Sequence, residues 1–178
     1  MIRTIWLPAA ILTWCTWTPA WGDEKRPDTK GSSSLDNEFL LKAHSANNAA
    51  LEYSKLVEKR STNQKVKDFA EQMLRDHRDV RESLGKLFKD RKVGSVAGTE
   101  REVRDEVDRL SKFSGTEFDR EYMKRLVQDH DATLTLFETQ ARDGKDNAIT
   151  AWTKEVLPTL KKHQQQAKEL SDEVNGKK

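Results

Sequence analysis

The chain is poor in residues that break helices or favour strands. Its 178 residues include eight glycines, four prolines and 7% aromatic residues. Runs of valine, isoleucine and threonine are almost absent. This composition predicts an all-α protein, and the length suits a single domain with its own core.

Neither sign of charge dominates the chain. It has 32 basic and 30 acidic residues, for a formal charge of +2, and the two signs are mixed throughout. A locally basic stretch at residues 86–92 is followed by an acidic one at residues 100–108, and both are typical of solvated helix faces. We therefore expect no nucleic-acid partner, because such proteins usually carry a basic patch or stripe.

The one long apolar stretch lies at the N-terminus. Residues 1–22 combine a short basic start, an apolar segment over residues 4–17 and small residues at Ala20 and Gly22. This pattern is typical of a secretory signal peptide, with cleavage expected after Gly22. The apolar segment is too short to predict a permanent membrane span in the mature chain. We expect a bacterial protein of the periplasm or the exterior.

Cys15 is the only cysteine, and it falls inside this signal segment. The bulky Trp14 before it argues against a lipid-modified cysteine. Its removal would leave a mature chain with neither disulfide nor thiol chemistry, so packing alone must hold the fold. The sequence also lacks a glycine-rich phosphate loop and a serine nucleophile elbow, which leaves no recognisable catalytic motif.

Helical periodicity organises the rest of the chain. Residues 23–34 are polar and predict a disordered lead. From residue 35 to residue 174, apolar residues recur at steps of three and four, which indicates amphipathic helices. Residues 175–178 form a tail.

Local signals divide residues 35–174 into four long helices. Ser61 and Gln64 form a capping box that should end the first helix near residue 60 and start the second, and Ser114 with Glu117 marks the third. The fourth should begin about Asp146. A crossover of about two dozen residues, containing a short helix, joins the second and third helices. The predicted fold is an all-α four-helix bundle with a long crossover that contains a short helix.

The four histidines occupy a repeated frame. His44 and His77 have the same spacing in the chain as His130 and His163, and all four lie on or beside the inward stripes. We therefore expect them in one layer of the bundle, where they could bind a transition metal such as zinc, copper or iron. The alternative is that each histidine is a core residue whose ring is satisfied by an aspartate, Tyr122 or water.

Carboxylates accompany the histidines. Asp76 and Asp129 each precede a histidine and are expected to accept hydrogen bonds from a neighbouring helix. Glu52 and Glu138 lie about 12 Å along their helices from the preceding histidine, so they would support the layer from outside or be solvated. A di-iron site needs a glutamate three residues before a histidine on two helices. The chain has leucine three residues before both His77 and His163, so ferroxidase or oxygenase chemistry is not expected.

Five ordered motifs between about residues 36 and 172 resemble the bacterial family called domain of unknown function 4142. They include residues 66–77, 127–138 and 157–163. The resemblance implies an exported ferritin-like bundle and assigns no activity. It singles out the following residues: His77, His130, His163, Asp76, Asp129, Tyr122 and Glu138.

The sequence departs from this family at one helix position. Members commonly carry a glutamate where this chain has Ala50. Either His44 or Glu52 then replaces that ligand, or the site is lost.

These observations support two functions. The first is an exported bundle, more a binding protein than an enzyme, with a metal layer at the four histidines. The alternative is a structural or interaction module of the cell envelope that contacts protein partners through its charged faces. A redox enzyme is a third reading, which would require an open coordination position on the metal.

Overall fold

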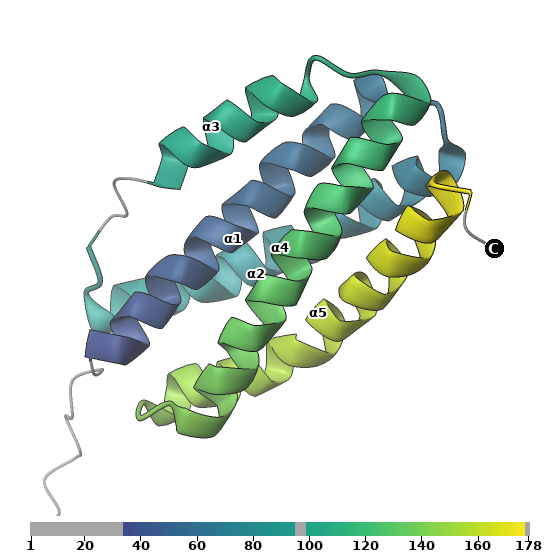
Figure 1. Ribbon diagram of the computed structural model, residues 1–178. Coiled ribbons are helices and arrows are strands. Elements are labelled where there is room, and N and C mark those ends of the chain that lie inside the picture. The colour runs from purple at the N-terminus through teal and green to yellow at the C-terminus, as the bar shows by residue number, and fades with distance from the viewer. Residues whose placement is uncertain (1–33, 95–98, 177–178) are drawn as a thin grey trace, which may run out of the picture.

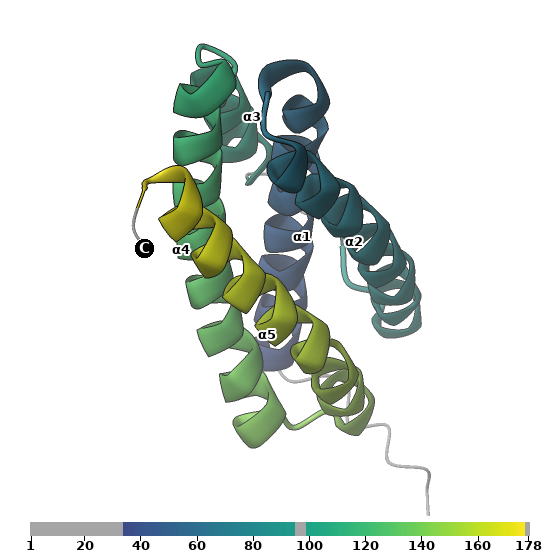
Figure 2. The same ribbon diagram turned by 90° about the vertical axis from the view of Figure 1, so that its right-hand side faces the viewer.

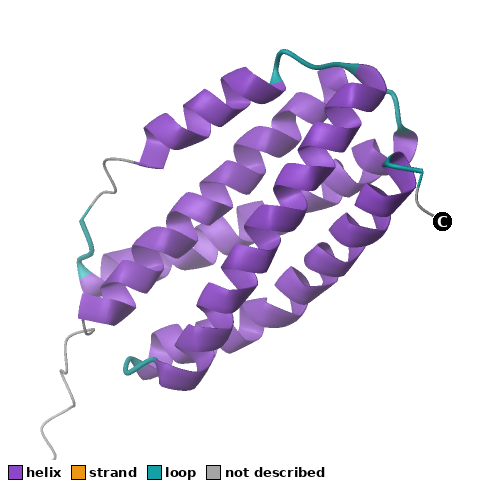
Figure 3. Ribbon diagram, viewed as in Figure 1, coloured by secondary structure: helices purple, strands orange, loops and turns teal. Residues whose placement is uncertain are grey.

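The computed structural model describes residues 34–94 and 99–176, and in this part of the chain it contains helices and no strand (Figure 3). The helices are α1 (Ser34–Arg60), α2 (Gln64–Arg91), α3 (Thr99–Leu110), α4 (Gly115–Asp143) and α5 (Asn147–Val174). The prediction of an all-α protein is confirmed. The predicted signal peptide and nearly all of the polar lead lie outside the described residues.

The four long helices form two antiparallel hairpins that pack into a bundle (Figures 1 and 2). One hairpin is α1 with α2, and the other is α4 with α5. The short α3 belongs to the predicted crossover and lies mainly along α1. The bundle and the crossover helix agree with the sequence prediction, while a specifically ferritin-like topology stays a prediction. None of the described helices is both long and apolar enough to cross a membrane.

Side-chain caps start two of the helices. Asn63 caps α2 by accepting a hydrogen bond from the backbone N–H of Lys65 at 3.0 Å. The capping-box prediction was therefore wrong about the residue, because the hydroxyl of Ser61 instead accepts from the N–H of Asn63. Asp146 caps α5, which agrees with the predicted start of this helix near residue 146. Each such cap contributes about 1 kcal/mol.

Two carboxylates, those of Asp36 and Asp146, hold one end of the bundle together. Arg91, at the end of α2, donates two hydrogen bonds to Asp146, at 2.7 and 2.9 Å. Asp36, near the start of α1, accepts hydrogen bonds from the Gln140 side chain and from the backbone N–H groups of Lys145 and Asp146. The loop between α4 and α5 is thus fixed to both helices of the other hairpin.

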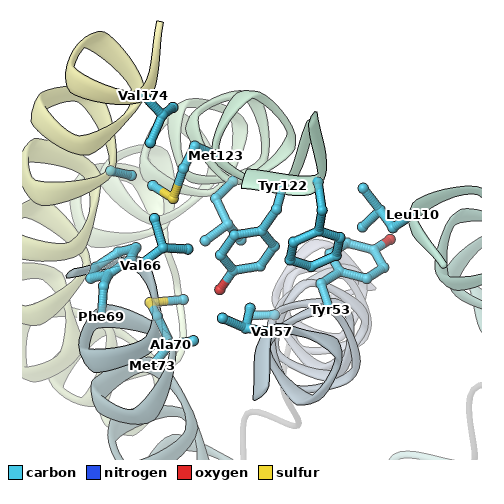
Figure 4. Close-up of a cluster of buried hydrophobic side chains, with 14 of the residues drawn as sticks. Tyr53, Val57, Val66, Phe69, Ala70, Met73, Leu110, Tyr122, Met123 and Val174 are labelled. Carbon is cyan, nitrogen blue, oxygen red and sulfur yellow. The ribbon is translucent and has the colours of Figure 1, made fainter. Parts of the chain in front are cut away.

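The apolar interior is divided into two clusters. In the first, side chains from all five helices meet around Tyr53 and Tyr122 (Figure 4). The second surrounds Phe39, Leu84 and Trp152. Along α2, α4 and α5, a buried histidine lies between the residues that belong to one cluster and those of the other. A polar layer therefore interrupts the core midway along the bundle.

Candidate metal centre

Three histidines from three helices meet in this layer. His77 comes from α2, His130 from α4 and His163 from α5, and they are 5%, 3% and 1% exposed. Their ring centroids lie 5.4 to 6.0 Å apart. One ring nitrogen from each histidine lies within 4.8 Å of those of the other two. The structure thus gathers three imidazoles around one point in the interior.

Hydrogen bonds fix the orientation of two of these rings. Nδ1 of His77 donates to the side-chain oxygen of Asn47 on α1, at 2.9 Å. Nδ1 of His130 donates to the backbone carbonyl of Leu126, one turn earlier on α4, also at 2.9 Å. Because these acceptors assign the proton to Nδ1, the Nε2 atom of each neutral ring carries a free lone pair.

The third ring, that of His163, is hydrogen-bonded through Nε2 instead of Nδ1. Nε2 of His163 donates to a carboxylate oxygen of Asp76 on α2, at 2.7 Å, so Nδ1 carries the lone pair. The three remaining atoms, Nε2 of His77, Nε2 of His130 and Nδ1 of His163, are all buried without a hydrogen-bond partner. An unpartnered buried polar group costs about 1–3 kcal/mol. The folded chain therefore keeps three unsatisfied acceptors in one place.

Burial keeps these imidazoles neutral. Desolvation lowers the pKa of His77 well below its usual value, and the neighbouring histidines lower it further. Desolvation also lowers the pKa of His130, to about 4, against the opposing effect of the Leu126 carbonyl. The pKa of His163 is lowered by desolvation, although Asp76 partly offsets this. Metal ions bind the neutral form, so no proton must be removed from these rings at neutral pH.

The spacing is close to what a metal ion requires. Around a tetrahedral ion with metal–nitrogen bonds of about 2.0–2.1 Å, ligand nitrogens lie about 3.3 Å apart. The nitrogens here lie within 4.8 Å of one another, so the rings would have to approach by about 1.5 Å at most.

A single water molecule satisfies this layer less completely than a metal ion. A cavity of about 20 Å³ lies beside His77 and His130, with Asn47 also in its wall. This is room for about one water molecule. Its two protons could serve the two Nε2 atoms, but Nδ1 of His163 would still lack a donor. One metal ion can accept all three lone pairs.

The structure does not bring His44 into this cluster. Its half-buried ring packs against Phe88, with centroids 5.5 Å apart, and lies within 3.5 Å of the Asn48 amide. Asn47 takes the inward position instead. Asn47 and His77 are equally far along the chain from Thr62, the middle of the α1–α2 loop, so they face each other across the hairpin.

The two predicted aspartates have different partners. Asp76 accepts a hydrogen bond from a neighbouring helix, as predicted. Asp129 does not, because it bonds to Arg125 on its own helix, at 2.8 Å. Burial raises the pKa of Asp129, against the opposing effect of Arg125.

The other predicted supporting residues lie away from the imidazoles. The fully buried Tyr122 shares a hydrogen bond of 2.9 Å with Ser54 in the first apolar cluster. Glu52 and Glu138 are exposed, and each forms an ion pair with a lysine. The hydrogen bond of Tyr122 and the ion pairs of Glu52 and Glu138 thus account for these three side chains without any contact to the histidines.

A comparison with family models places the sequence. The model described as "Domain of unknown function (DUF4142)" matches residues 23–170. The chain belongs to the DUF4142 family. Searches of curated proteins and of solved structures found no significant match. The DUF4142 match spans all three clustered histidines together with Asn47 and Asp76.

Asn47 is the residue of this DUF4142 domain whose role the sequence did not reveal. It lies on the inward stripe of the first helix, among alanines and leucines. A buried amide must find hydrogen-bond partners, so an asparagine on an apolar stripe is itself a signal of a polar layer. The histidines drew attention to the layer, but only the structure pairs Asn47 with His77.

Proposed function

We propose that the DUF4142 domain of this protein binds one transition-metal ion through Nε2 of His77, Nε2 of His130 and Nδ1 of His163. Two observations carry this proposal: each of the three histidines keeps one buried ring nitrogen without a partner, and the three rings offer nitrogens within 4.8 Å of one another. Three neutral nitrogen donors suit zinc, copper or iron. The apparent signal peptide supports a site of action in the bacterial periplasm or outside the cell.

The surroundings of the rings support the same reading. In metal sites, a ligating histidine usually donates its other N–H to a carboxylate, a carbonyl oxygen or water. Here Asp76 accepts from His163, the Leu126 carbonyl from His130, and the Asn47 side chain from His77. Each acceptor holds one ring nitrogen and leaves the lone pair of the other nitrogen free for a metal ion.

Metal binding can be tested with mature protein purified without a histidine tag. We expect one equivalent of zinc, copper or iron by elemental analysis, or by titration after treatment with a chelator. Free metal at about 100 times its dissociation constant should stabilise the fold by about 2.7 kcal/mol, seen as a higher melting temperature.

Single replacements should separate the three ligands from the fourth histidine. His77→Asn, His130→Asn and His163→Asn should each weaken metal binding strongly, because each removes one of three donors. His44→Asn is the matched control and should bind as the wild type does, since His44 lies outside the cluster. Equal losses in all four variants would refute the assignment.

The absence of stoichiometric metal, with no change in melting temperature on addition of zinc, copper or iron, would refute metal binding altogether. The histidine layer would then be a structural element of an envelope interaction module. In that case the replacements of His77 and His163 would change stability without the loss of any ligand.

A further inference from the structure

A surface groove leads towards the histidine layer. This groove, here called the α1–α4 groove, lies between α1 and α4, is bordered by Glu102 and Val103 of α3, and has a volume of about 440 Å³. The small cavity beside the histidines shares three wall residues with it, namely Ala46, Asp129 and Thr133. The groove and the cavity are therefore neighbours across one thin wall.

That wall is built largely of small side chains. Of its three shared residues, Ala46 on α1 and Thr133 on α4 have small side chains, and the third is Asp129 on α4. Side chains as small as those of Ala46 and Thr133 close the wall less completely than larger ones would.

Polar atoms in the cavity wall lack partners. Asn47, His77 and His130 all line the cavity and are at least nine-tenths buried. Nε2 of each histidine is unpartnered, and so is the amide nitrogen Nδ2 of Asn47. The residues that line the cavity thus carry two unpartnered ring nitrogens and one unpartnered hydrogen-bond donor.

We infer that the α1–α4 groove admits a small anion to an open fourth position on the metal, where the Asn47 amide donates a hydrogen bond to it. This inference rests on the proposed metal site. A site with three protein ligands keeps one coordination position open for water or another ligand, unlike a closed structural site. An anion bound there accepts the hydrogen bond that Nδ2 of Asn47 otherwise lacks.

The dimensions limit the size of the ligand. The cavity of about 20 Å³ holds about one water molecule. The atom of the anion that binds the metal takes up this room, so the rest of a two- or three-atom anion must extend towards the groove, and a larger organic substrate does not fit. Lys42, Arg125, Glu102 and Asp129 place both signs of charge around the groove, so size and the Asn47 donor set the selectivity.

The test uses the copper(II)-loaded protein and azide as the probe anion. Azide binding to copper produces a charge-transfer absorption, which gives both the affinity and the association rate. We expect azide to bind to the wild type. Ala46→Leu should keep its copper and slow azide association at least about tenfold, because the larger side chain blocks the wall between groove and cavity.

Ala151→Leu is the matched control. It makes the same substitution at an exposed position of α5 that lines neither the groove nor the cavity. It should bind azide as the wild type does. Thr133→Ala provides a second variant, should Ala46→Leu fail to fold, and it should accelerate azide association because it widens the same wall.

The outcomes distinguish this inference from the proposed function. A protein that takes up no copper overturns both. A protein that binds one copper at the three histidines but no azide has a closed site, and only the inference on access fails. Unchanged azide rates in both Ala46→Leu and Thr133→Ala would also overturn the inference, because the anion would then reach the metal by another route.

Discussion

Acidification should destabilise the metal-free protein through its buried histidines, and His130 allows the magnitude to be worked out. Its pKa is about 4 in the folded protein, where burial disfavours the charged ring. In the unfolded chain it should be about 6.5. Between these values the unfolded chain binds a proton that the folded protein does not, so stability falls as the pH falls.

The expected loss from His130 is about 2 kcal/mol at pH 5 relative to pH 7.5, and about 3 kcal/mol once the pH is below its folded-state pKa. Well above a pH of about 6.5 this histidine is neutral in both states and costs nothing. His77 and His163 act in the same direction, because their pKa values are also lowered.

Urea unfolding of the chelator-treated protein, followed by circular dichroism at both pH values, measures this loss. His130→Phe replaces the titrating ring by one that cannot be protonated. The free energy of unfolding should fall by about 2 kcal/mol less in this variant than in the wild type. A parallel His44→Phe variant controls for a histidine outside the cluster.

A difference below about 0.5 kcal/mol between the wild type and His130→Phe would refute the reasoning. It would mean that the folded protein accepts a proton on His130 as readily as the unfolded chain does, so this ring would not be held neutral in a closed interior.

Two further predictions concern residues that orient other groups. Asn47→Ala should weaken metal binding about 10- to 100-fold, because His77 loses the acceptor that fixes its ring, and titration with the metal would show this. Asn48→Ala is the control on the same helix, and an equal effect there would contradict the role of Asn47. For the two-bonded pair of Arg91 and Asp146, a double-mutant cycle in urea should give a coupling energy of about 1–3 kcal/mol. A value near zero would show that this pair does not hold the loop.

The sequence predicts the helices well because their signal is periodic and local. Apolar residues at steps of three and four define each long helix, and glycine or polar residues mark the turns. The ends are less certain, since several neighbouring polar residues can serve as a cap. At the start of α2, both Ser61 and Asn63 carry suitable side chains, and only the folded backbone shows that Asn63 is the cap.

The histidine layer is predictable in part. His77, His130 and His163 lie within inward stripes, so the sequence alone indicates that they face the core. His44 lies at the edge of its stripe. Consecutive helix residues point about 100° apart, so the pattern alone does not decide whether a residue at the edge faces inward or outward. The repeated spacing of the histidines favoured a layer of four histidines. In the structure, Asn47 takes the place predicted for His44 and bonds to His77.

The proton positions could not be predicted, because they depend on contacts between distant segments. Asp76 holds His163 through a hydrogen bond that joins α2 to α5. That bond decides which nitrogen of His163 keeps a free lone pair. No local pattern contains this information, since it depends on how the two hairpins are placed against each other.

The division of the three rings between the hairpins has a mechanical consequence. His77 belongs to the first hairpin, whereas His130 and His163 belong to the second, and contacts within each hairpin are more extensive than those between them. An ion held by all three would link the α1–α2 hairpin to the α4–α5 hairpin. Its removal should weaken the contact between the hairpins before either hairpin unfolds. Amide hydrogen exchange would then become faster first at the interface between the two hairpins.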